Sequence, residues 1–180
     1  MQINDFISEL DSQRFGFKVA KVGAEDKDLK EIMKLMSAND VKLCMTKVSL
    51  ERLDLLNQLE KNGFVIKDVQ VTYKYDLIQP IPIIRETNND LIIRETTQKD
   101  SDKIEILARD SFSNYGHYAA DDRLPIEKVS EIYGDWARRS NEDANVADKV
   151  FVAEINDEIA GFLSFKINKL DGFSYAAGGL

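Results

Sequence analysis

The spacing of apolar residues predicts alternating strands and helices in the first half of the chain. Three segments have the alternation or the apolar run of a strand, at 15–22, 41–46 and 64–77. Two segments between them have apolar residues at helical spacing, at 29–36 and 49–62. Ser49 is expected to cap the second helix, and Gly63 to end it, because glycine permits a left-handed turn.

The second half of the chain predicts a different order, with two helices ahead of a hairpin. Its expected elements are a strand at 91–95, helices at 98–112 and 125–136, a loop at 113–124, and strands at 150–155, 158–167 and from 173 onward. Thr97 with Asp100 indicates the start of the first helix, and Trp136 falls in the apolar stripe of the second. Asn156-Asp157 suits a tight hairpin turn.

Two prolines and a polar run indicate a boundary between these halves. Pro80 and Pro82 are followed by the polar run Glu86-Thr-Asn-Asn-Asp90. We therefore expect a small α/β domain at residues 1–80, a linker at 81–90 and a second domain at 91–180. The expected class is α/β, with a mixed sheet and flanking helices.

Composition and charge narrow the function classes. Of 180 residues, 43% are hydrophobic, and 24 Lys and Arg against 32 Asp and Glu give a formal charge of −8. This balance argues against a nucleic-acid binder and against a polybasic membrane-surface protein. The single cysteine, Cys44, excludes an internal disulfide and a multi-cysteine metal site. The sequence also has no apolar run of bilayer-spanning length, so we expect a cytoplasmic protein with no metal and no membrane partner.

The hairpin region carries a family resemblance. The run Val150-Phe-Val-Ala-Glu-Ile155, then Asn-Asp, then Glu158-Ile-Ala-Gly-Phe-Leu163, resembles the second and third strands of the GNAT superfamily of N-acetyltransferases. Two further runs, Asp11-Ser-Gln-Arg-Phe-Gly-Phe17 and Asn114-Tyr-Gly-His-Tyr-Ala-Ala-Asp-Asp-Arg-Leu-Pro125, are similar to segments of the TDP-fucosamine (nucleotide-amino-sugar) N-acetyltransferases.

This resemblance implies transfer of an acetyl group from acetyl-CoA to the amine of a nucleotide-linked amino-deoxy sugar. It also implies that the loop after the first helix lines the acceptor pocket, with Arg123 available to a phosphate: the residues are His117, Tyr118, Asp121 and Arg123. The alternative is that these residues form a structural loop. The Asp11-Ser12 segment likewise has two interpretations, ligand contact or a structural role in closing the small domain onto the second one.

The cofactor part of the family pattern is incomplete. The family binds the pyrophosphate of acetyl-CoA through a glycine-rich segment after its fourth strand. The corresponding residues here are Ala177, Gly178, Gly179 and Leu180, and Tyr175 is a weak candidate for proton relay. The sequence therefore resembles a family member truncated at its cofactor site, with doubtful activity. The rival hypothesis is a non-catalytic α/β module that forms a homodimer through its last strand.

Overall fold

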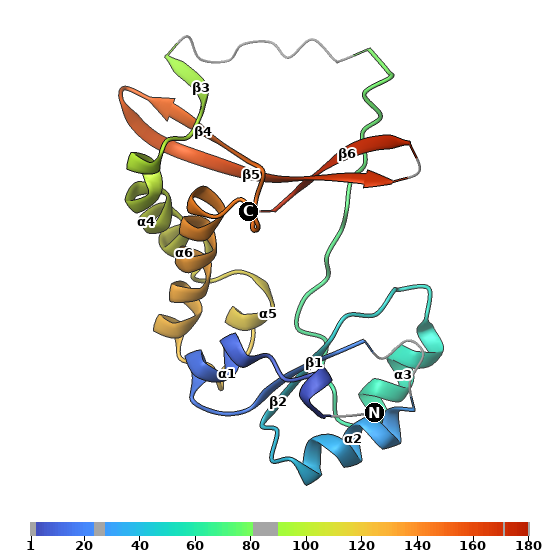
Figure 1. Ribbon diagram of the computed structural model, residues 1–180. Coiled ribbons are helices and arrows are strands. Elements are labelled where there is room, and N and C mark those ends of the chain that lie inside the picture. Colours follow the sequence, from blue (N-terminus) through green and yellow to red (C-terminus); the bar gives the residue numbers. More distant parts are fainter. Residues whose placement is uncertain (1–2, 24–27, 81–89, 171, 180) are drawn as a thin grey trace. The chain divides into compact units, whose positions relative to one another are not determined.

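The computed structural model describes residues 3–23, 28–80, 90–170 and 172–179, and the chain divides into two compact units, 1–67 and 68–180. The first unit contains a parallel pair of strands, and the second a four-stranded antiparallel sheet with helices (Figure 1). The expected α/β class is confirmed, with parallel and antiparallel pairing in separate sheets. The domain limits 1–80 and 91–180 remain a prediction, and the expected linker at 81–90 lies almost entirely outside the described residues.

The first unit is built on two short parallel strands joined by a helix. Its elements are η1 (Ile3–Asp5), α1 (Glu9–Phe15), β1 (Val19–Val22), α2 (Leu29–Ala38), β2 (Leu43–Thr46) and α3 (Leu53–Lys61). In the pair, Val19 lies opposite Leu43. Apolar residues one helical turn apart on α2, Ile32 and Met36, are buried against Ala20. The helix predicted at 29–36 and the strand predicted at 41–46 are therefore confirmed.

Two predicted element starts in the first unit are wrong. Phe15 does not begin a strand but ends α1, because Gly16 adopts a φ of 75° and donates its N–H to the Ser12 carbonyl. Ser49 does not cap α3, whose N-cap position is Arg52. Instead, the Ser49 hydroxyl accepts the Glu51 N–H at 3.3 Å, so serine closes a local turn ahead of the helix.

The long strand predicted at 64–77 is also wrong. No described residue between 64 and 77 belongs to a strand, and Tyr73 is 92% exposed. Alternation fixes which side chains share a face, but a strand also requires a neighbouring backbone to accept and donate its hydrogen bonds. The described residues provide no such neighbour for this segment.

The second unit follows the predicted order of strand, two helices and hairpin. Its elements are β3 (Leu91–Glu95), η2 (Gln98–Asp100), α4 (Ser101–Phe112), α5 (Gly116–Ala119), α6 (Ile126–Glu142), β4 (Lys149–Ile155), β5 (Glu158–Leu170) and β6 (Phe173–Gly178). The sheet order is β3-β4-β5-β6, with every neighbouring pair antiparallel. Asn156 and Asp157 have φ values of 51° and 64°, as a type I′ hairpin turn requires.

Helices α4 and α6 cover one face of this sheet. Ile104 and Ala108 of α4 and Ala137 of α6 are fully buried, in one apolar cluster with Val150 and Val152 of β4. Residues directly opposite each other in a sheet share a face, so the helix-covered face continues from Val152 across the neighbouring strands. The other face carries large apolar side chains such as Leu163 and Ile167, which are about half exposed.

Two details of the helical region differ from expectation. Trp136, predicted in the buried stripe, is 37% exposed, because α6 turns Val129, Tyr133 and Ala137 toward its neighbours at four-residue spacing. The segment predicted as a loop, 113–124, contains the short helix α5.

Candidate functional site

β6 is the outermost of the described strands of its sheet and pairs with β5 alone. The Gly179 N–H donates to the Ser164 carbonyl at 2.8 Å, which makes these two residues a hydrogen-bonded pair. Such pairs recur at every second residue of an antiparallel ladder, so the N–H groups of Ser174, Ala176 and Gly178 point away from β5. β6 therefore presents a row of backbone donors and acceptors at the edge of the sheet.

The predicted cofactor residues divide between the two sides of this strand. Gly178 has its N–H on the outer side, whereas Ala177 and Gly179 have theirs toward β5; Leu180 lies outside the described residues. A Cβ at position 179 would come within 2.5 Å of the Ser164 Oγ, so close strand approach requires glycine there. Gly178 has open space around it instead.

Tyr175, the predicted proton relay, lies on β6 opposite Asn168 and is 47% exposed. The register from β6 through β5 to β4 places the Tyr175 side chain on the same face of the sheet as Val150 and Val152. Helices α4 and α6 cover this face nearer the centre of the sheet. Tyr175 thus extends a half-exposed side chain from the same strand that carries the outer row of N–H groups.

The predicted acceptor residues lie on and after α5, which is anchored on α6. The Tyr133 hydroxyl donates to the Tyr115 carbonyl at 3.1 Å, and its ring stacks on Phe112 with centroids 5.3 Å apart. Gly116 begins α5 with a φ of 79°, and a Cβ there would overlap the Tyr133 hydroxyl. Burial raises the pKa of Tyr133, so this hydroxyl stays protonated as a donor.

His117, Tyr118, Asp121 and Arg123 lie in one short segment, in which the His117 side chain contacts Tyr118 and the Asp121 side chain contacts Arg123. The rings of His117 and Tyr118 lie 4.1 Å apart, and Tyr118 is buried. Asp121, also buried, accepts two hydrogen bonds from the Arg123 guanidinium: 2.8 Å from Nε to Oδ1 and 2.5 Å from Nη2 to Oδ2. These bonds raise the pKa of Arg123. An incoming phosphate would therefore compete with Asp121 for this arginine.

The two groups of predicted residues occupy different parts of the second unit. The acceptor residues follow α4 and pack on α6, whereas Tyr175 and Gly178 belong to the outer strand; Figure 1 shows α5 and β6 apart from each other. The sequence offered no way to judge this separation, because it depends on how strand and helix pack.

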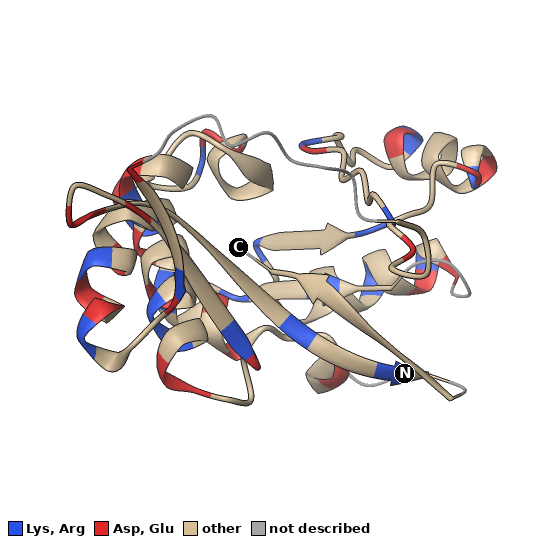
Figure 2. Ribbon diagram, turned by 90° about the horizontal axis from the view of Figure 1, so that it is seen from above, with Lys and Arg blue, Asp and Glu red and all other residues tan. Residues whose placement is uncertain are grey.

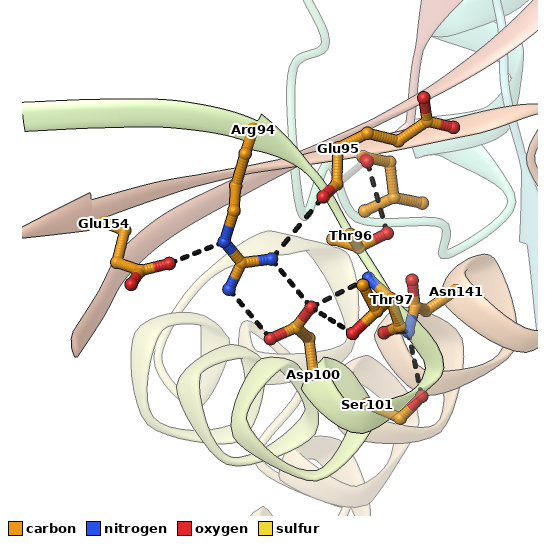
Figure 3. A network of polar contacts seen from close by, with 9 residues as sticks. Arg94, Glu95, Thr96, Thr97, Asp100, Ser101, Asn141 and Glu154 are labelled. Atoms are coloured by element: carbon orange, nitrogen blue, oxygen red, sulfur yellow. Dashed lines mark hydrogen bonds and ion pairs between the residues drawn. The ribbon is translucent and has the colours of Figure 1, made fainter. Parts of the chain in front are cut away.

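A charged network that the sequence analysis did not single out joins the sheet to the helices (Figure 3). The Arg94 Nε donates to the Glu154 Oε2 at 2.6 Å, and its Nη1 and Nη2 donate to the two Asp100 carboxylate oxygens at 2.8 and 3.0 Å. Asp100 also accepts the Thr97 N–H at 2.8 Å. At the other end, Asn141 of α6 donates to the Thr97 carbonyl at 2.9 Å.

This network has an electrostatic consequence for Asp100. The hydrogen bonds from Arg94, followed by those from Thr97, hold the pKa of the buried Asp100 carboxyl well below its usual range. The capping role of Thr97 and Asp100 was readable from their spacing. The contact between Arg94 and Glu154 could not be predicted from spacing, because these residues are 60 positions apart and meet only through the β3–β4 register.

The Asp11-Ser12 motif has structural contacts within the first unit. Asp11 is 2% exposed and lies 2.6 Å from the Lys21 ammonium. The Ser12 hydroxyl accepts the Val19 N–H at 2.9 Å and donates to the Ser8 carbonyl at 2.6 Å, which ties α1 to β1. These contacts give the motif a structural role within the first unit, and its predicted role in closing the small domain onto the second one stays a prediction.

Cys44 of β2 is half-buried and packs against the core of the first unit. Burial raises the pKa of its thiol to about 11. Among residues 3–23, 28–80, 90–170 and 172–179, no cluster of three His, Cys, Asp or Glu side chains has metal-binding geometry. None of the described helices has the length and apolarity needed to cross a membrane.

Comparison with known proteins leaves the family open. No protein-family model matches the chain, and no curated protein matches it.

Proposed function

We propose that the chain is a GNAT-like N-acetyltransferase that transfers an acetyl group from acetyl-CoA to the amine of a nucleotide-linked amino-deoxy sugar. The observation that carries the proposal is the element order of the second unit: strand, helices, hairpin and outer strand, in a fully antiparallel sheet. This is the order that the resemblance at 150–163 implies. The acceptor class rests on the resemblance of the Asp11 and Asn114 segments alone.

The donor set on β6 fits the thioester end of acetyl-CoA. In the resembled fold, an N–H group of the fourth strand holds the thioester carbonyl, and the outward N–H groups of Ala176 and Gly178 lie on the corresponding strand. When bound, acetyl-CoA supplies the acetyl group: the amine nitrogen bonds to the carbonyl carbon, the carbon–sulfur bond breaks, and the amine proton leaves toward the thiolate. Tyr175, exposed beside these N–H groups, is the group available to relay that proton.

The same strand has no positive charge to bind the pyrophosphate of acetyl-CoA. Residues 173–179 include no cationic side chain, so the charged end of acetyl-CoA would rely on backbone donors alone. We therefore expect acetyl-CoA to bind more weakly than in a domain with a complete glycine-rich segment.

Calorimetric titration of the purified chain with acetyl-CoA tests the proposal, with a TDP-linked amino sugar as the second titrant. Saturable binding of acetyl-CoA, and acetylation of the sugar detected by mass spectrometry, support it. CoA without the acetyl group is the matched control, since it lacks the carbonyl that the β6 donors would hold. Absence of both heat and acetylated product contradicts the proposal.

A second candidate function is a non-catalytic module that self-associates through β6. The observation that favours it is that the outer strand carries no charged residue (Figure 2). In addition, half of its backbone groups are turned away from β5, its neighbour in the sheet.

A further inference from the structure

We propose that two copies of the chain join through antiparallel β6 strands, with Ala176 of one copy opposite Ala176 of the other. The inference rests on the second candidate function and adds to it the strand orientation and the register. The product is one continuous sheet made from the two four-stranded sheets.

The first argument is that β6 lacks the features that normally protect an outer strand. Outer strands of natural proteins avoid pairing through charged residues, prolines, bulges or short length. Residues 173–179 contain no charged residue and no proline, and the β5–β6 register runs without a shift from Phe173 to Gly178. Within the described parts of the chain, the outer side of the strand therefore has no strand partner from Phe173 to Gly178.

The second argument is the match of backbone groups. The outward N–H and carbonyl groups belong to Ser174, Ala176 and Gly178, as the Gly179–Ser164 hydrogen bond fixes. With Ala176 on a twofold axis, Ser174 meets Gly178 of the second copy, and each of the three pairs is of the hydrogen-bonded type. About six inter-chain hydrogen bonds follow from this geometry.

The third argument is that this register places large side chains opposite small ones. Tyr175, 47% exposed, lies opposite Ala177 of the second copy, and Phe173, 57% exposed, lies opposite Gly179. Aromatic rings packed over small cross-strand neighbours stabilise strand pairs. A register centred on Ser174 instead would place Ala176 and Gly178 beyond the start of the second copy's β6 at Phe173, so that fewer inter-chain hydrogen bonds could form.

Sedimentation velocity over a concentration series tests the inference. We expect the chain to associate into a species of twice its 20.5 kDa mass. Ala176→Pro removes an outward N–H that β5 does not use, and should weaken dimerisation by about 100-fold or more. Ile167→Lys is the matched control: residue 167 lies opposite Ala176 on β5, on the same face but one strand inward, and its variant should still dimerise. Circular dichroism and thermal unfolding check that each variant is folded.

A charge pair tests the register. Ala176→Lys and Ala176→Asp each place like charges opposite each other in the dimer, and an equimolar mixture should associate about tenfold more tightly than either variant alone. A monomer at all concentrations overturns both the self-association function and the inference. A dimer that survives Ala176→Pro leaves self-association standing but overturns pairing through β6, and a mixture no tighter than its components overturns the register.

Discussion

Replacing Asp100 by asparagine should destabilise the second unit selectively, because Asp100 is the centre of the Arg94 network. Asp100 is 6% exposed, and its carboxylate accepts two hydrogen bonds from Arg94 and one from the Thr97 N–H. An asparagine retains the oxygen that accepts from Thr97 and from the Arg94 Nη1, but its amide NH₂ faces the Arg94 Nη2 donor. Loss of that hydrogen bond and of the negative charge beside the guanidinium should lower the free energy of unfolding by about 2–3 kcal/mol, and the melting temperature by about 4–12 °C.

Urea unfolding followed by circular dichroism measures this change, with Asp102→Asn as the matched control. Asp102 lies two residues further along the same helix end and pairs with Arg138, but its side chain is 82% exposed. A surface ion pair contributes about 0–1 kcal/mol, so the control should be nearly neutral. Equal effects of the two substitutions would refute the argument that burial and the bidentate geometry make Asp100 important.

The same site predicts a pH dependence. Because the native pKa of Asp100 is depressed, its stabilising contribution is complete above the ordinary carboxyl pKa of about 3.9 and is lost as the pH falls through the lower native value. The difference between wild type and Asp100→Asn should therefore be constant from about pH 5 to 7 and should shrink in stronger acid. A difference that grows on acidification would contradict the assignment.

Two further substitutions or reactions test local features. Gly116→Ala should lower the free energy of unfolding by about 1–3 kcal/mol, because the new Cβ would overlap Tyr133 at a backbone φ of 79°. Gly178→Ala is the neutral control, because Gly178 has open space around it. Equal effects of the two substitutions in thermal unfolding would contradict the packing of Gly116 against Tyr133. Burial raises the pKa of the Cys44 thiol from 9.0 to about 11. Because the thiolate is the reactive form, Cys44 should react with a disulfide reagent about 100-fold more slowly in the native protein than in urea. Equal rates would show that the native fold does not shield the thiol.

Much of the second unit was readable from local signals. The spacing of Ile104 and Ala108, the Thr97–Asp100 cap and the Asn156-Asp157 turn each act within a few residues, so the pattern alone predicted the helix and the hairpin correctly. The strand predicted at 64–77 is wrong because strand formation depends on a distant partner. The segment at 64–77 alternates like a strand, but its hydrogen bonds need a second segment that local spacing does not specify.

The residues of the candidate sites could be predicted from the sequence, but their contacts could not. Sequence resemblance placed His117, Asp121 and Arg123 in one loop, but the salt bridge between Asp121 and Arg123 depends on side-chain geometry. The Arg94–Glu154 pair likewise required the β3–β4 register. Sequence spacing cannot supply either contact, because both depend on directions set by packing.

By itself, the sequence determined most of the helices and strands of the second unit, the class of the fold and the chemistry available on each segment, because caps, turns and apolar periodicity act over a few residues. The tertiary structure decided which carboxylates are paired with arginine, that the α5 residues and the β6 residues lie apart, and that Ser174, Ala176 and Gly178 turn their backbone groups away from β5. Those outcomes follow from strand register and helix packing, which join residues that are distant in the chain.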